Sequence, residues 1–420
     1  MSRLVHLGIG AFARAHTLAY TADAGGWDVA VFTGRSPAIA ETLTAQDGRY
    51  GMIVRGPEGD EVREISVITE AHPAADVAAL ERLIADPETA VVTLTITEKG
   101  YAPGGDATTS APVRLASALR ARREAGIEEP IALVSCDNLS ENGAALRESV
   151  LAAIDAEGDE QMRDWFDGHV DVISTMVDRI TPGAGEEEQK LASERLGFPD
   201  RATVVTEPFH EWVIEDAFRG ERPAWEEAGA QLTDDVGLHE KRKLRLLNGA
   251  HTYLACAGQN AGHGIVPDAV RDPEVRRGML ALWAEARSTL DLPADELDGY
   301  CEALIERFEN PRLVDHLSRI VADSSVKLGV RILPVIRERG GPDEAPGAVA
   351  AVAAWTRWVT DRVRAGEDVP DPQADAIAEA ARIEDDSARI GALVAVLGVE
   401  GAEAEAFVAR VLQCGDEYDG

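Results

Sequence analysis

The residues best suited to chemistry lie in one short polar segment in the second half of the chain. The segment contains Lys243, with Asn248 five residues later, His251 eight residues later and Glu240 three residues earlier. On a regular α-helix these intervals place the four side chains within one broad sector of the helix surface. A base, an amide donor and an imidazole are therefore expected to face one side.

These residue types suit the oxidation of an alcohol by hydride removal. The hydroxyl must lose its proton as the hydride leaves the same carbon, and a lysine accepts that proton near neutral pH if burial lowers its pKa. Amide groups can then stabilise the developing alkoxide. A second interpretation is a solvated basic helix, because Lys241, Arg242 and Arg245 lie beside Lys243.

The first third of the chain alternates short apolar runs with helical patterns. Apolar or β-branched residues dominate four runs, at 4–8, 27–33, 90–97 and 131–135. Strands that are buried on both faces have this composition, and their alternation with helices indicates a parallel sheet. Two later runs, 170–176 and 203–206, could extend the sheet.

The pattern becomes helical from about residue 237. Apolar residues recur at helical spacing over 276–290, 294–308, 348–365 and 372–383, with Gly or Pro at the breaks. The sequence therefore predicts an α/β fold of two domains. Residues 1–236 would form a Rossmann-like, doubly wound parallel sheet and residues 237–420 a mostly α-helical domain, with an active site in the cleft between them.

The first predicted strand ends in a glycine-rich turn before a helix that we expect over residues 13–24. Gly8 and Gly10 permit a tight turn in which the backbone approaches a pyrophosphate at a helix N-terminus. Ala13 takes the third position of the GxGxxG fingerprint and still allows close helix–strand packing. We predict a dinucleotide site that includes Gly8, Gly10, Ala11 and Phe12.

The end of the second predicted strand bears on the choice of dinucleotide. An acidic residue usually binds the ribose 2′-hydroxyl of NAD there, but this strand runs into Gly34, Arg35 and Ser36. Arg35 could pair with the 2′-phosphate of NADP, stack on the adenine or face solvent. We expect NAD as the cofactor, with NADP as the alternative.

The composition argues against several classes of partner. The 75 acidic and 41 basic residues give a formal charge of −34, and such a surface repels nucleic acids and anionic membranes. We find no apolar run of membrane-spanning length and no secretory signal pattern, and therefore expect a cytoplasmic protein. We separately expect a monomer or small homo-oligomer. Its four cysteines form no CxxC pair, so we expect neither a metal site nor a disulfide framework.

Lys243, Asn248 and His251 form a Lys-x4-Asn-x2-His pattern that resembles the signature of the polyol-specific long-chain dehydrogenases, the mannitol dehydrogenase family. The similarity continues along most of the chain. It includes residues 8–16 (GIGAFARAH), 35–37 (RSP), 45–50 (AQDGRY), 97–101 (TEKGY), 135–139 (SCDNL), 177–182 (VDRITP), 206–209 (TEPF) and 307–311 (RFENP). The chain departs from the family in having Ala13 in place of a histidine, and in being shorter than we associate with the family.

The resemblance implies a metal-independent mechanism. Lys243 would be the general base in oxidation and the general acid in reduction, while Asn138 and Asn248 would form the oxyanion hole. His251 would orient a substrate hydroxyl. Glu240 would carry the proton between Lys243 and solvent.

The resemblance also implies substrate contacts by Asp178, Arg319 and Lys327. Structural alternatives stay open for these residues and for the oxyanion hole. Asn138 could cap a helix, and Asp178 could form an ion pair with Arg179. Arg319 and Lys327 could be ordinary surface cations.

The expected activity is that of an oxidoreductase acting on a small-molecule polyol or keto-sugar, such as D-mannitol and D-fructose. The first alternative is a fructuronate (mannonate) or tagaturonate reductase, whose acidic substrate Lys241 and Arg242 could attract. Another is a metabolite sensor on a Rossmann scaffold that has lost its chemistry. The intact set around Lys243 argues against a sensor, because a binding protein has no need of a buried base.

Overall fold

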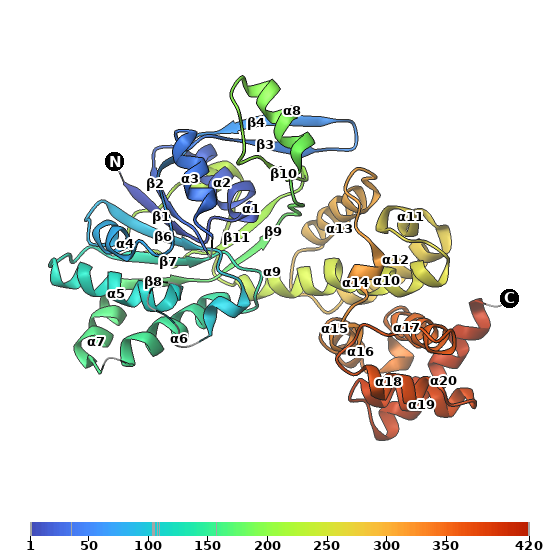
Figure 1. Cartoon of the computed structure of the whole chain (residues 1–420). Helices are drawn as coiled ribbons and strands as arrows, with labels where there is room; N and C mark the ends of the chain where they lie inside the picture. Colours follow the sequence, from blue (N-terminus) through green and yellow to red (C-terminus); the bar gives the residue numbers. More distant parts are fainter. Residues whose placement is uncertain are drawn as a thin grey trace. The chain divides into compact units, whose positions relative to one another are not determined.

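The computed structural model describes residues 2–34, 36–102, 106, 108, 110–156 and 158–418. The chain folds into two compact units, Met1–His239 and Glu240–Gly420. Their division falls within helix α9 (Val236–Lys243), three residues after the boundary that the sequence suggested. The first unit runs from blue to green in Figure 1 and the second from yellow to red.

A six-stranded sheet forms the centre of the N-terminal unit. Its strands are β1 (Arg3–Leu7), β2 (Asp28–Phe32), β5 (Ile68–His72), β6 (Thr89–Leu94), β7 (Ile131–Ser135) and β8 (Val170–Ile173). They lie in the order β5-β2-β1-β6-β7-β8, and every neighbouring pair is parallel. The predicted Rossmann-like sheet is confirmed.

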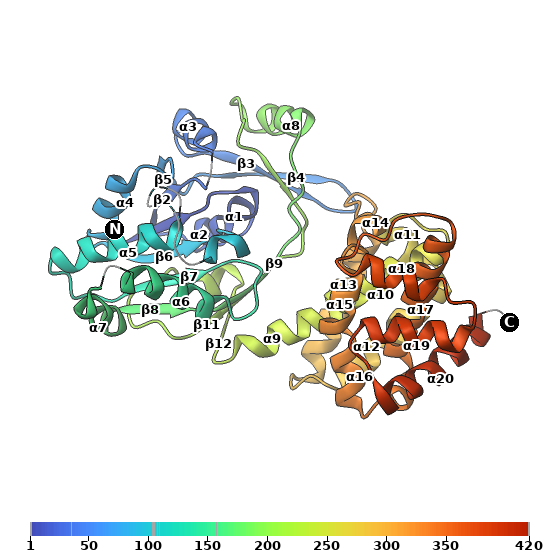
Figure 2. The same ribbon diagram turned by 60° about the horizontal axis from the view of Figure 1, so that its bottom comes forward.

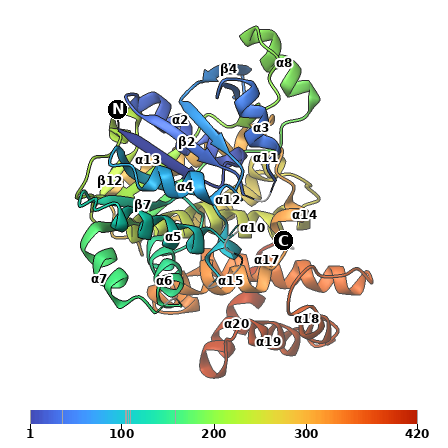
Figure 3. The ribbon, with the colours of Figure 1, turned by 60° about the vertical axis from the view of Figure 1, so that its left-hand side comes forward.

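Helices cover both faces of this sheet. One face packs against α1 (Ala11–Ala15) and α2 (Thr17–Ala24), and the other against α4 (Val77–Ile84), α5 (Ala111–Glu124), α6 (Asn142–Asp155) and α7 (Glu160–His169). Successive strand residues supply opposite cores, as Leu4 and Val5 do. Figure 3 shows α4 and α5 side by side. The sheet is therefore doubly wound, as predicted.

The strand order reverses at the centre of the sheet. From β1 the order runs to β2 and β5 on one side and to β6, β7 and β8 on the other. In open α/β sheets, ligands bind at the carboxyl ends of the two strands where the order reverses. The glycine-rich turn after β1 and the loop after β6 lie at this switch point.

The unit also contains two three-stranded sheets, the helices α3 (Ala38–Ala45) and α8 (Glu186–Leu196), and the short 3-10 helices η1 (Glu98–Tyr101) and η2 (Trp225–Ala228). One sheet joins β3 (Tyr50–Arg55), β4 (Asp60–Ile65) and β10 (Val204–Thr206), with α8 packed beside it (Figures 1 and 2). The other joins β9 (Thr175–Asp178), β11 (Glu211–Glu215) and β12 (Gln231–Thr233). The expectation that residues 203–206 extend the main sheet is wrong, because β10 pairs with β3. Of the run 170–176, only β8 joins the main sheet.

The described part of the C-terminal unit has helices and no sheet. After the end of α9, these helices are η3 (Leu244–Asn248), α10 (Gly249–Asn260), α11 (Val266–Arg271), α12 (Pro273–Arg287), α13 (Ala294–Glu309), α14 (Leu317–Ile320), α15 (Ser324–Arg331), α16 (Leu333–Arg339), η4 (Pro342–Glu344), α17 (Pro346–Arg364), α18 (Ala374–Ala381), α19 (Asp386–Val396) and α20 (Gly401–Tyr418). α17 packs against α10, α12, α18 and α20 (Figure 2). The predicted helical domain is confirmed. Within the described ranges, none of the helices has the length and apolarity needed to cross a membrane.

Local sequence explains where these helices begin. Asp272 caps α12 by accepting hydrogen bonds from the amides of Glu274 and Val275, and Pro273 takes the first helical position. Apolar side chains at helical spacing, such as Val275, then bury one face of α12. The four helices predicted from this pattern correspond to α12, α13, α17 and α18.

Candidate active site

The predicted catalytic segment contains a π-helical turn. α9 ends at Lys243, η3 forms the π-helix, and α10 carries His251. The amide of Gly249 donates to the carbonyl oxygen of Leu244, five residues earlier. The expectation of a regular α-helix is therefore wrong here, because a π turn bonds residues five apart rather than four.

The π turn changes which side chains share a face. In an α-helix, residues five apart lie roughly 140° from each other around the axis, so the expectation that a regular helix brings Lys243 and Asn248 to one side is also wrong. Across a π turn they lie close to one full turn apart, so Asn248 comes nearly in line with Lys243. His251 follows Asn248 by three residues of α-helix and stays in the same sector. The Lys-x4-Asn-x2-His spacing thus fits a segment with a π turn better than a continuous α-helix.

The flanking cations of this segment are paired with acids of the same unit. Arg242 is 2% exposed and lies 2.5 Å from Glu296, measured from Nη1 to Oε1. Arg245 is also buried and forms an ion pair with Glu338, whose carboxylate lies 3.3 Å from the amine of Lys241. The interpretation as a solvated basic helix is therefore wrong.

The other predicted residues of this segment occupy different environments. Lys243 is buried, with 8% of its surface exposed, whereas Asn248 and His251 are half-buried. The imidazole of His251 packs on the ring of Phe308, with a centroid distance of 4.9 Å. Glu240 lies three residues before Lys243 on α9, about one helical turn away.

The two predicted cations of the substrate site have partners in their own unit. The amine of Lys327 donates to the carbonyl oxygen of Ile320 at 2.8 Å and to that of Ala322, and burial lowers its pKa. The side chain of Arg319 is 77% exposed and lies 2.6 Å from Asp315. Arg319 therefore has the environment of a surface cation. Lys327 instead stabilises the turn after α14 by binding two of its backbone carbonyl oxygens.

The turn after β1 has a backbone conformation that favours glycine. Gly8 has a φ of +96°, and a β-carbon there would lie 2.1 Å from the carbonyl oxygen of Thr95. The amide of Gly10 donates to the carbonyl oxygen of Gly8 at 2.7 Å, and α1 begins at Ala11. A β-carbon on Gly10 would meet only that carbonyl oxygen, at 3.7 Å, so the space beside Gly10 is open to a ligand.

The residues after this turn anchor it to the sheet. Ala13 is fully buried, and the ring of Phe12 stacks on that of His16 at a centroid distance of 4.9 Å. The helix predicted over 13–24 is interrupted at His16, where α1 gives way to α2. Arg14, which the sequence did not single out, donates from Nε to the carbonyl oxygen of Gly10 at 3.2 Å. These features fit a bound dinucleotide, whereas Arg35 lies outside the described residues.

Asn138 is exposed in the bend after β7. The cap position of α6 is taken by Glu141, so the interpretation of Asn138 as a helix cap is wrong. The neighbouring Asp137 is buried, and its carboxylate accepts hydrogen bonds from the amides of Ile96 and Thr97 and from the hydroxyl of Tyr101, at 2.7 to 2.9 Å. Burial raises the pKa of Asp137.

Asp137 therefore ties the bend that carries Asn138 to the loop after β6. Asn142 holds the same bend, since its side-chain amide donates to the carbonyl oxygens of Asp137 and Thr175 at 2.9 and 2.7 Å. Sequence reasoning missed both roles. The available signal was an acid placed directly after a buried strand, beside the predicted asparagine.

Asp178 is the last residue of β9 and is 6% exposed. It lies opposite Glu211 in the antiparallel register of β9 and β11. The guanidinium of its neighbour Arg179 donates to the backbone carbonyl oxygens of Ala15 at 2.5 Å and Glu207 at 3.1 Å. Arg179 thus links β9 to the end of α1.

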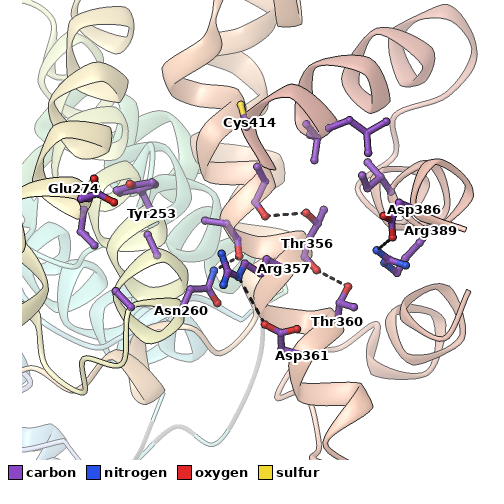
Figure 4. Close-up of a pocket in the computed structure, with 18 of the residues that line it drawn as sticks. Tyr253, Asn260, Glu274, Thr356, Arg357, Thr360, Asp361, Asp386, Arg389 and Cys414 are labelled. Carbon is purple, nitrogen blue, oxygen red and sulfur yellow. Dashed lines mark hydrogen bonds and ion pairs between the residues drawn. The ribbon is translucent and has the colours of Figure 1, made fainter. Parts of the chain in front are cut away.

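A separate cavity of about 610 Å³ lies in the C-terminal unit, between α10, α12, α17, α19 and α20 (Figure 4). Polar side chains in its lining pair locally: Arg357 lies 3.9 Å from Asp361, and Asn260 donates to the carbonyl oxygen of Ala354 at 2.9 Å. Its lining includes none of the predicted site residues that the structure describes. We therefore keep it apart from the candidate site.

Metal-ligating residue types are dispersed. Within the described part of the chain, no group of three or more His, Cys, Asp or Glu side chains is placed to hold a metal ion. All four cysteines are buried, and burial raises the pKa of the Cys136 thiol to about 12. This thiol is therefore protonated at neutral pH, which makes it a weak nucleophile.

Comparison with known proteins places both units in one family. The Mannitol dehydrogenase Rossmann domain matches residues 2–227, and the Mannitol dehydrogenase C-terminal domain matches residues 235–416. D-mannonate oxidoreductase of Escherichia coli (strain K12) is 35% identical, over 96% of this chain and 89% of that protein.

Two solved structures resemble the whole chain. D-sorbitol dehydrogenase in substrate-free form has a TM-score of 0.86 at 27% identity, covering 99% of this chain and 93% of that one. Mannitol 2-dehydrogenase of Pseudomonas fluorescens, in a ternary complex with NAD and D-mannitol, has a TM-score of 0.74 at 32% identity, covering 100% and 92%. With both of its units matched, the chain belongs to the mannitol dehydrogenase family of oxidoreductases.

Proposed function

We propose that this protein transfers a hydride between NAD and a polyol–ketose pair such as D-mannitol and D-fructose, with Lys243 as the base. The observation that carries the proposal is the burial of Lys243 at the start of a π turn that aligns Asn248 and His251 with it. Burial disfavours the charged form of an amine in general, and a proton acceptor must be uncharged. The NAD and D-mannitol held by the Pseudomonas relative also support it.

In the proposed mechanism, Lys243 accepts the proton of the substrate hydroxyl during oxidation and returns it during reduction. Asn138 and Asn248 donate amide hydrogen bonds to the oxygen that gains charge. His251 orients a neighbouring hydroxyl, and Glu240 exchanges the proton with solvent. The nicotinamide ring, when bound, accepts or supplies the hydride.

Substrate contacts complete the proposal. Asp178, buried at the end of β9, accepts hydrogen bonds from further substrate hydroxyls. Arg319 and Lys327 make further contacts with the substrate. When substrate binds, Arg319 leaves its ion pair with Asp315 and Lys327 leaves its hydrogen bonds with backbone carbonyl oxygens. Both then bind substrate oxygens instead.

A second candidate function is the reduction of a hexuronate, fructuronate or tagaturonate. The Escherichia coli D-mannonate oxidoreductase supports this candidate. The suggestion that Lys241 and Arg242 attract the substrate carboxylate loses force, because Glu338 and Glu296 pair with them. Arg319 is more exposed than Lys241 and Arg242, but Asp315 pairs with it in the same way.

The direct test compares D-mannitol oxidation with fructose and fructuronate reduction, each with both nicotinamide dinucleotides. Lys243→Ala is expected to lower kcat by about 10²–10⁴-fold on whichever substrate is used. Lys241→Ala is the matched control, because it removes a nearby lysine that is paired with Glu338, and it should keep kcat. Full turnover by Lys243→Ala would refute the proposal.

A further inference from the structure

Side chains from other helices bind the backbone of the π turn. The indole Nε1 of Trp283, on α12, donates to the carbonyl oxygen of Leu246 at 2.8 Å. Nη1 of Arg331, on α15, lies 3.3 Å from the carbonyl oxygen of Asn248, to which it donates. The hydroxyl of Thr252 donates to the same oxygen at 2.9 Å and accepts from Arg331 at 3.0 Å. Both carbonyl groups belong to η3.

These donors compensate for the altered backbone hydrogen bonding of a π turn. In an α-helix each carbonyl oxygen accepts from the amide four residues later. Where the bonding changes to five residues and back, the pattern of partners is disturbed: the amide of Gly249 is shared between the carbonyl oxygens of Leu244 and Leu246. A shared amide satisfies each carbonyl group less well than an undivided hydrogen bond, so a further donor lowers the free energy of the turn. Donors from α12 and α15 therefore stabilise η3 relative to a regular α-helix.

Trp283 is also connected, through the ring of Phe308, to His251. Trp283 is 2% exposed, and its ring lies 6.3 Å from that of Phe308 between centroids. Phe308 in turn packs on the imidazole of His251. Trp283 thus contacts the π turn through its N–H group and supports His251 through one intervening ring.

Loss of the π turn would separate the residues that it aligns. If this segment became a regular α-helix, Asn248 would lie roughly 140° around the axis from Lys243. The amide and the amine would then face different directions, and they could not act on one substrate oxygen. The register of η3 is therefore a requirement of the proposed chemistry.

We propose that Trp283 and Arg331 are positioning residues, which hold η3 in its π-helical register and thereby keep the catalytic side chains on one face. This inference rests on the proposed function, because it takes Lys243 to be the base. Neither residue needs to touch the substrate. Their effect is on the geometry of the residues that do.

The test replaces each donor by a side chain of similar size. Trp283→Phe keeps an aromatic ring but loses the N–H group, and Arg331→Met keeps length but loses the donors. We expect kcat to fall about tenfold or more, while KM for the dinucleotide changes by less than about twofold. The isotope effect with a deuterated polyol should rise, because hydride transfer becomes slower relative to product release.

Two control variants remove comparable interactions elsewhere. Trp225→Phe loses a buried indole hydrogen bond to Thr21, and Arg337→Met loses an ion pair with Glu403 on the surface. Both should lower stability without changing kcat or the isotope effect. If Arg331→Met does not fold, Thr252→Val tests the same cluster, and it should lower kcat while the two control variants keep theirs.

The outcomes separate this inference from the proposed function. If Lys243→Ala is inactive but Trp283→Phe and Arg331→Met keep their kcat and isotope effect, the positioning role is refuted and the proposed function stands. If Lys243→Ala keeps its turnover, the proposed function is refuted directly. Reduced kcat in both positioning variants, with normal controls, supports the inference.

Discussion

The carbonyl oxygen of Thr95 lies 2.1 Å from the position that a β-carbon on Gly8 would take. Gly8 follows β1 and Thr95 follows β6, the two strands at the switch point of the sheet. The hydroxyl of Thr95 also donates to the carbonyl oxygen of Gly8 at 2.7 Å. The shape of the glycine-rich turn is therefore set by the contact between the loops that follow the two central strands.

Gly8→Ala is expected to destabilise the fold and to weaken dinucleotide binding. The added methyl group would overlap the backbone of Thr95, and a φ of +96° disfavours a side chain. We expect a loss of more than about 2 kcal/mol in the free energy of unfolding. Urea unfolding and titration with NAD measure the two effects.

Gly10→Ala is the matched comparison for this prediction. Its β-carbon would meet only the carbonyl oxygen of Gly8, at 3.7 Å, so the fold should tolerate it. The methyl group would nevertheless occupy the space where the pyrophosphate approaches. We expect near-normal stability with weaker NAD binding, and wild-type affinity in Gly10→Ala would argue against a dinucleotide at this turn.

The fold could be predicted from the sequence where one pattern had one explanation. The buried apolar runs that form β1, β2, β6 and β7 alternate with helices, and this alternation of fully buried strands with helices is typical of a parallel sheet. Short runs were ambiguous: residues 203–206 have the composition of a core strand but pair with β3. Pairing depends on long-range contacts, which local composition does not encode.

The candidate site was predictable in its residue types but not in its local geometry. The spacing of Lys243, Asn248 and His251, together with the family resemblance, predicts a site here, but the same spacing predicts an α-helix. The π turn accepts hydrogen bonds from Trp283 and Arg331, which are distant in sequence and reach it only because α12 and α15 pack against this segment. For the same reason, Asp137 was overlooked, since its partners are on another loop.

His6 should make stability depend on pH. Burial lowers the pKa of His6 to about 4, below its ordinary value of 6.5. Thr95 already donates to Gly8, so its oxygen accepts from Nε2 of His6, and Nδ1 then accepts from Thr93. These bonds suit a neutral imidazole with its proton on Nε2.

The sign follows from proton linkage. Between pH 6.5 and about 4 the unfolded chain binds a proton at His6 that the folded protein does not. The stabilisation is complete above pH 6.5 and is lost as the pH falls, with an expected loss on the order of 2 kcal/mol at pH 5. Urea unfolding of wild type and His6→Gln at pH 7, 6 and 5 measures it. If the free energy of unfolding changes equally with pH in wild type and in His6→Gln, His6 is not the group responsible.

Asp137→Ala should loosen the loop after β6. It removes the acceptor of two backbone amides and of the Tyr101 hydroxyl, all at 2.7 to 2.9 Å. Leaving two amides unsatisfied should cost about 2–5 kcal/mol in the free energy of unfolding, whereas Tyr101→Phe should cost about 1 kcal/mol. Because this loop borders the bend that carries Asn138, kcat should also fall in Asp137→Ala. Unchanged kcat would mean that the bend holds Asn138 without Asp137.

Glu296→Gln should show how much the ion pair between Arg242 and Glu296, beside Lys243, contributes to the free energy of unfolding. Arg242 is 2% exposed, and its guanidinium also lies 4.2 Å from the ring centroid of Tyr300, so little solvent reaches it. Loss of the negative charge should cost about 2–4 kcal/mol in the free energy of unfolding, between the values for surface and fully buried pairs.

Glu403→Gln is the control: it breaks the exposed pair with Arg337 and should cost less than about 1 kcal/mol. Urea midpoints at low and high salt distinguish them, because salt screens the exposed pair and affects the buried one less. Equal costs in both variants would show that Arg242 keeps solvent access, and that the segment around Lys243 is less enclosed than its burial implies.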